Sequence, residues 1–219
     1  MRKKILVIGG SGVFGTRVAG LLSRVRVVDG MDVTIAARNL GNLEKASTEI
    51  ASGRLVGEAR KPSIVQLDIT DMTQLRDVIR DEKPSVVINA AGTFFDTSYD
   101  VPRLCVQEKT NYVDLADNRL YVTQFSKELD TEAKKAGVTL LTAASTTLAL
   151  SSAIVDKFHE ILSSSPLKHV DIAMSPGNRL PRFVHFLSLS LSLSPHTNAL
   201  NSQRTRHDCI CAFSFRPKI

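Results

Sequence analysis

The chain has 219 residues, of which 43% are hydrophobic and 23% charged, with a formal net charge of +6 at pH 7. This composition excludes a largely disordered protein, because enough apolar side chains are present to build a core. No stretch approaches the roughly 18 consecutive apolar residues of a transmembrane helix. The apolar run Ile5–Ile8 is too short for the core of a signal peptide. Three cysteines and no Asn-X-Ser/Thr acceptor favour a reducing compartment, and we expect a cytoplasmic protein.

The positive charge is concentrated at one end of the chain. Residues 178–219 contain six Arg and Lys side chains against the single Asp208, which leaves a net charge of only +1 for residues 1–177. A nucleic-acid interface requires a basic face on a structured region, or basic side chains interleaved with stacking aromatics. The basic segment lacks this pattern, so we expect no nucleic-acid partner.

Short β-branched runs alternate with longer helical patterns over residues 1–177. We expect strands at 4–8, 32–36, 63–67, 85–89, 112–115, 138–142 and 170–174. Between them we expect helices at 13–24, at about 40–51 and at about 148–162. Two more helices are marked by their ends, one capped by Asp71 after the third strand and a Lys/Glu/Ala-rich one closed by Gly137 before the sixth. Strands that are apolar on both faces and separated by helices indicate a parallel sheet covered on both sides. The expected fold class is therefore α/β, with a doubly wound, mostly parallel sheet.

Residues 178–219 depart from this order. Leu187–Ser194 alternates leucine and serine with a period of two. Such a segment either forms a strand with one apolar face or belongs to a poorly ordered, low-complexity region. We expect the second, and therefore an irregular basic tail that follows a domain of residues 1–177.

A glycine motif comes directly after the first expected strand and opens the first expected helix. It reads Gly10-x-Gly12-x-x-Gly15, which in this context is the dinucleotide fingerprint of a Rossmann-like fold. One glycine permits the tight turn, one lets the main chain approach a pyrophosphate, and Gly15 allows close packing of helix on strand. A structural turn without a ligand is the alternative. The expected cofactor-loop residues are Gly10, Ser11, Gly12, Val13, Phe14 and Gly15.

The residues after the second expected strand predict which dinucleotide binds. NAD-binding proteins place an Asp or Glu there for the ribose hydroxyls, whereas an Arg suits the 2′-phosphate of NADP. No acid occurs between Thr34 and Leu43, and Arg38 follows the strand with Asn39 beside it. We therefore expect NADP(H) rather than NAD(H), held by Arg38 and Asn39. An ordinary solvated surface side chain is the alternative for Arg38.

Two further loops follow expected strands at the carboxyl ends, where ligands bind in this architecture. Asp68 follows the third strand, and its carboxylate would accept a hydrogen bond from the adenine amine. Capping of the next helix is the alternative role, which suits Asp71 better. The small residues after the fourth strand leave room for the dinucleotide or, alternatively, only permit tight packing: Ala90, Ala91 and Gly92.

Four motifs together resemble the saccharopine dehydrogenase-like oxidoreductases: Gly-Gly-Ser-Gly-Val-Phe-Gly (9–15), Asn-Ala-Ala-Gly (89–92), Tyr-Val-Asp-Leu-Ala-Asp (112–117) and Pro-Gly-Asn-Arg (176–179). The resemblance covers roughly residues 3–180. It implies hydride transfer between C4 of nicotinamide and an imine, a secondary amine or a carbonyl of an unknown small molecule. It also implies roles in the cofactor groove for Gly10, Ser11, Gly12, Phe14, Gly15, Arg38, Asp68, Ala90, Ala91 and Gly92.

The chain departs from these relatives beyond Arg179. There the relatives continue into a second α+β domain that covers the nicotinamide and supplies most substrate contacts. Here the Leu-Ser repeat and the basic tail follow, so we expect a truncated member whose uncovered apolar surface favours self-association. We assign no catalytic acid or base. The alternatives to an oxidoreductase are a non-catalytic NADP-binding or sensing module and an inactive fragment.

Two other chemistries have weaker support. A short-chain dehydrogenase requires a Tyr followed four residues later by a Lys that lowers the phenol pKa. None of the three tyrosines has a Lys at that spacing: Tyr99, Tyr112 and Tyr121. His207-x-Cys209-x-Cys211 would supply three zinc ligands but no fourth, and we expect no metal site.

Overall fold

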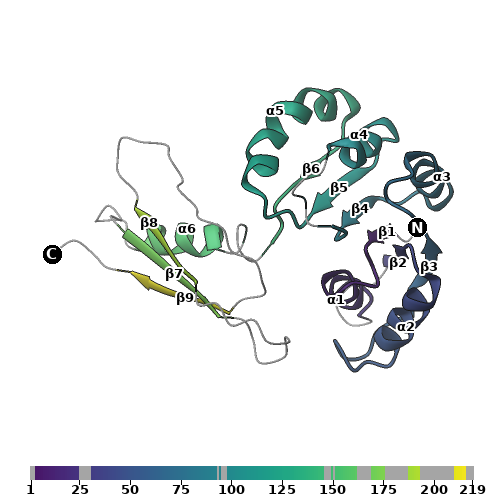
Figure 1. Cartoon of the computed structure of the whole chain (residues 1–219), viewed down its shortest axis with the longest axis horizontal. Helices are drawn as coiled ribbons and strands as arrows, with labels where there is room; N and C mark the ends of the chain where they lie inside the picture. Colours follow the sequence, from purple (N-terminus) through teal and green to yellow (C-terminus); the bar gives the residue numbers. More distant parts are fainter. Residues whose placement is uncertain are drawn as a thin grey trace. The chain divides into compact units, whose positions relative to one another are not determined.

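The computed structural model describes residues 3–24, 31–92, 94, 98–145, 149, 151–161, 169–175, 187–192 and 210–215 (Figure 1). The chain divides into two compact units, Met1–Ala144 and Ser145–Ile219. The first contains a six-stranded sheet and the second a three-stranded sheet. The expected domain boundary at residues 177–178 stays a prediction, because residues 176–186 lie outside the described ones.

The sheet of the first unit has the strand order of a doubly wound dinucleotide-binding fold. Its strands are β1 (Lys3–Ile8), β2 (Met31–Ala37), β3 (Ser63–Gln66), β4 (Val86–Asn89), β5 (Asn111–Asp114) and β6 (Leu140–Leu141). They lie in the order β3-β2-β1-β4-β5-β6, and every neighbouring pair is parallel. The strand order reverses between β1 and β4, where ligands bind in such sheets. The expected α/β fold class is therefore confirmed.

Five helices accompany this sheet in the described part of the first unit. They are α1 (Val13–Leu22), α2 (Leu40–Ala51), α3 (Met72–Glu82), α4 (Asp100–Gln107) and α5 (Arg119–Ala136). Three begin at a side-chain cap, since Asn39, Asp71 and Asn118 each accept a hydrogen bond from a main-chain N–H of the first turn. Helix α5 ends at Gly137, which adopts the left-handed conformation. The cap at Asp71 and the end at Gly137 agree with the sequence analysis.

Successive residues of β1 enter two separate cores, because side chains of a strand alternate between the faces of its sheet. Ile5 and Val7 pack in the core that contains residues of α1 and α2. Leu6 and Ile8 pack in the core that contains residues of α3, α4 and α5. The sheet is therefore covered by helices on both faces, as its doubly apolar strands predict (Figure 1).

The second unit contains α6 (Ser151–Ile161) and the strands β7 (His169–Ser175), β8 (Leu187–Ser192) and β9 (Ile210–Phe215). The strand expected at 170–174 is present as β7, but its expected place in the parallel sheet is wrong, because β7 pairs antiparallel with both β8 and β9. Residues 187–192 of the Leu-Ser repeat form a strand, which is the alternative that the sequence analysis ranked second. In this register Ile172 lies opposite Leu189 and Phe213.

Candidate functional site

The loop between β1 and α1 turns at Gly9, which precedes the expected cofactor-loop residues. The Gly9 N–H donates to the Ala36 carbonyl at 2.8 Å, and the Gly9 carbonyl accepts from the Gly12 N–H at 2.9 Å. Its φ of 77° lies in the left-handed region, and a Cβ here would be 2.8 Å from the carbonyl carbon of Ala90. Only glycine meets both conditions. The signal in the sequence was the glycine pair that directly follows a buried strand.

Gly10 and Gly15 allow close approach between neighbouring elements. A Cβ at position 10 would lie 2.5 Å from the Cβ of Ile35, and one at position 15 would lie 2.7 Å from the carbonyl carbon of Gly9. Thr16 ties the loop from inside, because its buried hydroxyl donates to the Gly10 carbonyl at 2.9 Å. The glycine loop therefore rests directly on β1 and β2 through main-chain contact.

The first turn of α1 presents main-chain N–H groups without a side-chain partner. Gly12 is the N-cap residue and makes no side-chain capping bond, and the first turn contains no acid. Val13 and Phe14 are 54% and 51% exposed, and Ser11 is partly exposed. An uncapped helix N-terminus attracts an anion through its N–H groups and its dipole. The loop thus fits the pyrophosphate of a dinucleotide, which needs both close main-chain approach and free donors.

Arg38 and Asn39 follow β2 at the carboxyl edge of the sheet. Arg38 is exposed, and its carbonyl accepts a hydrogen bond at 2.8 Å from the side chain of Gln66 at the end of β3. Asn39 caps α2, because its Oδ1 accepts from the Asn42 N–H at 2.8 Å. The structure therefore gives Asn39 a capping role that the sequence analysis did not assign.

Asp68 lies after β3 and its carboxylate is held in a fixed orientation. Its Oδ1 accepts hydrogen bonds from the N–H and the hydroxyl of Thr70, at 3.0 and 2.8 Å. The Asp68 N–H donates to Oε1 of Gln74 at 2.8 Å. The hydrogen bonds from Thr70 lower the pKa of Asp68 below its usual value, and the positive charge of Arg38 lowers it further. Asp68 is thus an anion near Arg38, while Asp71 caps α3.

The residues after β4 lie against the glycine loop. The Ala90 N–H donates to the Ile8 carbonyl at 2.9 Å, and the Ala91 N–H donates to Oδ1 of the buried Asn89 at 3.0 Å. Gly92 has a φ of 89°. Because Gly9 lies against Ala90, the two loops meet at the point where the strand order reverses. Arg38 and Asp68 lie at the ends of the adjacent strands β2 and β3.

Two buried polar residues at this edge belong to motifs quoted above, but the sequence assigned them no role. Asn89 ends β4 and Asp114 ends β5, with exposed fractions of 1% and 0%. Both side chains bind main-chain N–H groups of the loops that follow their strands. The signal in the sequence was that each belongs to a motif of the family resemblance, at 89–92 and 112–117.

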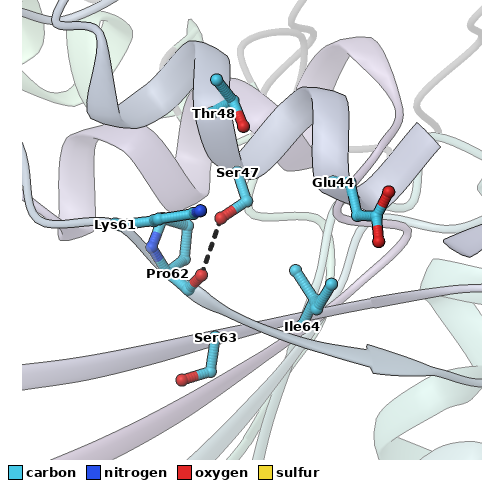
Figure 2. Close-up of a pocket in the computed structure, with 7 residues that line it drawn as sticks. All are labelled: Glu44, Ser47, Thr48, Lys61, Pro62, Ser63 and Ile64. Atoms are coloured by element: carbon cyan, nitrogen blue, oxygen red, sulfur yellow. Dashed lines mark hydrogen bonds between the residues drawn. The ribbon is translucent and has the colours of Figure 1, made fainter. Parts of the chain in front are cut away.

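A separate pocket of about 460 Å³ lies between α2 and β3 (Figure 2). The Ser47 hydroxyl donates to the Pro62 carbonyl at 2.8 Å across one side of it. Ser63, the first residue of β3, also lines the pocket, whereas Asp68 follows the other end of this strand. The pocket is therefore separate from the loops described above.

The described residues also bear on two other expectations. Among them, no group of three or more His, Cys, Asp or Glu side chains is arranged to hold a metal ion. His207 and Cys209 lie outside the described residues, as does the Pro-Gly-Asn-Arg motif at 176–179. In the part of the chain that the structure describes, no helix is both long and apolar enough to cross a membrane.

Comparison with known families gives one match. The family described as "Saccharopine dehydrogenase NADP binding domain" matches residues 5–141, which span β1 to β6. This range contains every site residue expected from the sequence. No curated protein matches the chain in sequence.

The yeast saccharopine dehydrogenase is a solved structure that shares the fold of this chain. The apo saccharopine dehydrogenase (L-Glu forming) of Saccharomyces cerevisiae superposes with a TM-score of 0.60 and 22% identity, over 80% of this chain and 36% of the yeast chain. A β-ketoacyl-[ACP] reductase of Bacteroides thetaiotaomicron superposes with a TM-score of 0.49 and 22% identity, over 64% of this chain and 75% of the reductase. The chain thus spans about a third of the length of the yeast enzyme.

Proposed function

The chain belongs to the family of saccharopine dehydrogenase NADP-binding domains, and we propose that it holds NADP(H) for a hydride-transfer reaction of the saccharopine dehydrogenase type. The observation that carries this proposal is the glycine loop beneath the uncapped N-terminus of α1, at the point of strand-order reversal. A pyrophosphate needs that combination of close main-chain approach and free N–H donors.

We propose that Arg38 selects NADP(H) by binding the 2′-phosphate. Two observations support this role: Arg38 is exposed at the carboxyl end of β2, and the Gln66 side chain donates a hydrogen bond to the Arg38 carbonyl. A charge-assisted hydrogen bond contributes about 1.5–3 kcal/mol, which corresponds to roughly a 10- to 150-fold preference for NADP(H) over NAD(H). Asn39, beside it, keeps the start of α2 in place while its amide NH₂ remains able to donate.

The other expected site residues have matching roles in this proposal. The main chain of Gly10–Gly15 receives the pyrophosphate, with Ser11, Val13 and Phe14 as its exposed rim. Asp68 accepts a hydrogen bond from the adenine amine, for which its anionic, fixed carboxylate is suited. The residues from Ala90 to Gly92 line the groove between the two halves of the dinucleotide.

The reaction class is hydride transfer to or from a carbon–nitrogen or carbon–oxygen bond. When bound, NADP(H) supplies or accepts the hydride at C4 of nicotinamide, and the substrate is an imine, a secondary amine or a carbonyl compound. The residues of this chain bind and orient the dinucleotide. The proposal assigns them no proton transfer.

We also propose a cytoplasmic location and self-association. The low cysteine content supports a reducing compartment. Edge strand β3 and exposed side chains such as Leu120, at 74%, support contact between copies. Gel filtration tests the proposed self-association. Elution as a monomer across a tenfold range of concentration would count against self-association.

Thermal melting of the purified chain tests the proposed binding of NADP(H). The chain is melted with NADPH, with NADH and without nucleotide, and the series is repeated with Arg38→Ala. Ligand at 100 times its dissociation constant adds about 2.7 kcal/mol of stability, enough to raise the midpoint by a few degrees. We expect NADPH to stabilise the wild type more than NADH does, and the mutant to lose this difference. A cooperative melt that neither nucleotide shifts would contradict the proposal.

A further inference from the structure

Four buried polar side chains form two hydrogen-bonded pairs beneath the carboxyl ends of β4 and β5. The Asn89 Nδ2 donates to the Tyr112 hydroxyl at 3.2 Å, and the Tyr121 hydroxyl donates to Oδ2 of Asp114 at 3.2 Å. The two tyrosine rings both pack against Phe125, with ring centroids 6.4 and 5.7 Å from that of the phenylalanine. All four residues are at most 5% exposed. We call these four residues the strand-end network.

Each end of the strand-end network holds loops that follow parallel strands. At one end, Oδ1 of Asn89 accepts from the Ala91 N–H after β4. At the other end, Oδ1 of Asp114 accepts from three donors: the Ala116 N–H at 3.0 Å, the Thr142 hydroxyl at 2.7 Å and the Ala143 N–H at 3.0 Å. One network therefore fixes the loops after β4, β5 and β6.

The loop after β6 shows what this fixation achieves. Ala143 has a φ of 61°, a left-handed conformation that is unfavourable for a residue with a Cβ. Its N–H is bound by the Asp114 carboxylate, and the next N–H, of Ala144, is bound by the Asp114 carbonyl at 2.9 Å. Asp114 thus holds this turn in a conformation that its own sequence does not favour.

Each hydrogen-bonded pair of the network depends on both of its members. A buried carboxylate is stable only when donors satisfy its oxygens, and here both oxygens of Asp114 accept. Burial, and next the negative charge of Asp114, raise the pKa values of Tyr112 and Tyr121 above their usual range, so both phenols stay protonated donors at neutral pH. Loss of one hydroxyl leaves buried partners without a hydrogen bond.

The position of the network assigns it to one half of the dinucleotide site. A doubly wound fold consists of two mononucleotide-binding halves, and the dinucleotide lies across both. The glycine loop follows β1, Arg38 follows β2 and Asp68 follows β3. These three strands form the half of the sheet that takes the adenosine side of the dinucleotide. Among the described residues, the network holds the loops after β4, β5 and β6, which belong to the half left for the nicotinamide nucleotide.

We infer that the strand-end network positions the loops that receive the nicotinamide half of NADP(H), and leaves adenosine binding to the other half of the sheet. This inference rests on the proposed function. The four side chains are buried, so they act through the loops they hold, as positioning residues. Rigid loops here reduce the entropy lost when the nicotinamide nucleotide is ordered.

The test compares a whole dinucleotide with its adenosine half. Titrations of the full chain with NADPH and with 2′,5′-ADP give two dissociation constants, and their ratio reports the nicotinamide side alone. Tyr121→Phe removes the hydroxyl that donates to Asp114 and retains the ring. Tyr99→Phe is the matched control, because the Tyr99 hydroxyl donates to the Tyr121 carbonyl and lies outside the network.

We expect Tyr121→Phe to weaken NADPH binding about 5- to 20-fold, the usual effect of an unsatisfied buried polar group, and to change 2′,5′-ADP binding less than twofold. Tyr99→Phe should leave the ratio of the two constants unchanged. Equal weakening of both ligands, or no change in either, would overturn the inference. If the wild type bound neither NADPH nor 2′,5′-ADP, the proposed function itself would fail. Asn89→Ala provides a second variant, at the opposite end of the network, with the same expected ratio.

Discussion

The carbonyl group of Gly9 lies directly against Gly15, so that a Cβ at position 15 would be 2.7 Å from the Gly9 carbonyl carbon. The end of β1 and the start of α1 therefore touch through main-chain atoms alone. This contact brings the N–H groups of the first helical turn to the carboxyl edge of the sheet. A phosphate can be bound there because no side chain separates the helix from the strand.

Gly15→Ala should destabilise the chain. The added methyl group has to displace the main chain of Gly9, and overpacking of this kind costs about 1–3 kcal/mol. Urea denaturation measures the free energy of unfolding. Because the displaced loop is also the proposed pyrophosphate site, NADPH should no longer stabilise the variant against urea.

Gly41→Ala is the control for this substitution. Gly41 lies within α2, and the nearest atom to a Cβ there, Oδ1 of Asn39, would be 3.5 Å away. Alanine is favoured over glycine inside a helix by up to about 1 kcal/mol, so this variant should be as stable as the wild type or more stable. Similar destabilisation by both substitutions would show that contact with Gly9 is not the cause.

Asn39→Asp should separate folding from cofactor preference. Asp caps a helix as well as Asn does, so the cap of α2 and the free energy of unfolding should be retained. The new negative charge lies next to Arg38 and repels a 2′-phosphate. We expect about a tenfold or greater loss of NADPH affinity with NADH affinity little changed, measured by fluorescence titration.

Asn42→Asp provides the matched control, since it places the same charge three residues further along α2, away from the end of β2. It should change NADPH affinity much less than Asn39→Asp does. Equal losses would indicate a general effect of charge rather than contact with the phosphate.

The fold of the first unit could be predicted from sequence because its signals are local. Each of its strands is a short apolar run, and helix ends are marked by residues such as Asp71 and Gly137. The glycine motif is recognisable because it follows one apolar strand pattern and begins a helical pattern. Boundaries were less accurate: β6 contains only Leu140–Leu141, although the pattern extends over 138–142.

Strand pairing and the hydrogen-bond partners of side chains depend on contacts between residues far apart in the chain. The sequence did not reveal these contacts. The pattern of residues 170–174 predicts a strand, but not that its neighbours are residues 187–192 and 210–215. Likewise, the local pattern does not indicate that the Gln74 side chain accepts a hydrogen bond from the N–H of Asp68. The strand-end network joins residues up to 29 positions apart, from Asp114 to Ala143.

Stability should depend on pH through Glu108. Hydrogen bonds from Arg80, at 2.9 Å to each carboxylate oxygen, lower the pKa of Glu108 below its ordinary value of 4.5, and Arg76 contributes further. The folded state therefore binds this proton more weakly than the unfolded state. The resulting stability is fully present above pH 4.5 and is lost as the pH falls through the folded-state pKa.

Glu108→Gln should remove this contribution, about 1 kcal/mol for such a surface pair, from the free energy of unfolding at pH 7 and much less of it near pH 3. Urea denaturation at both values measures the difference. Asp130→Asn, which breaks the exposed pair with Lys134, serves as the comparison and should have a smaller effect. An identical loss at both pH values for Glu108→Gln would contradict the account.

Cys105 should be inert in the folded chain. Its side chain is fully buried, and burial raises the pKa of the thiol to about 12. The thiolate is the reactive form, so a disulfide reagent at pH 8 should react with Cys105 only after unfolding. Measurement in a Cys209→Ser, Cys211→Ser variant isolates this thiol. Rapid labelling without denaturant would contradict the buried position of Cys105.

The central claim is that the chain binds NADP(H) through the glycine loop and selects it through Arg38. Isothermal titration of the wild type and Arg38→Ala with NADPH and NADH tests this claim most directly. We expect the wild type to bind NADPH roughly 10- to 150-fold more tightly than NADH, and Arg38→Ala to bind the two with similar affinity. Equal affinities in the wild type, or a preference for NADPH that persists in Arg38→Ala, would contradict the account.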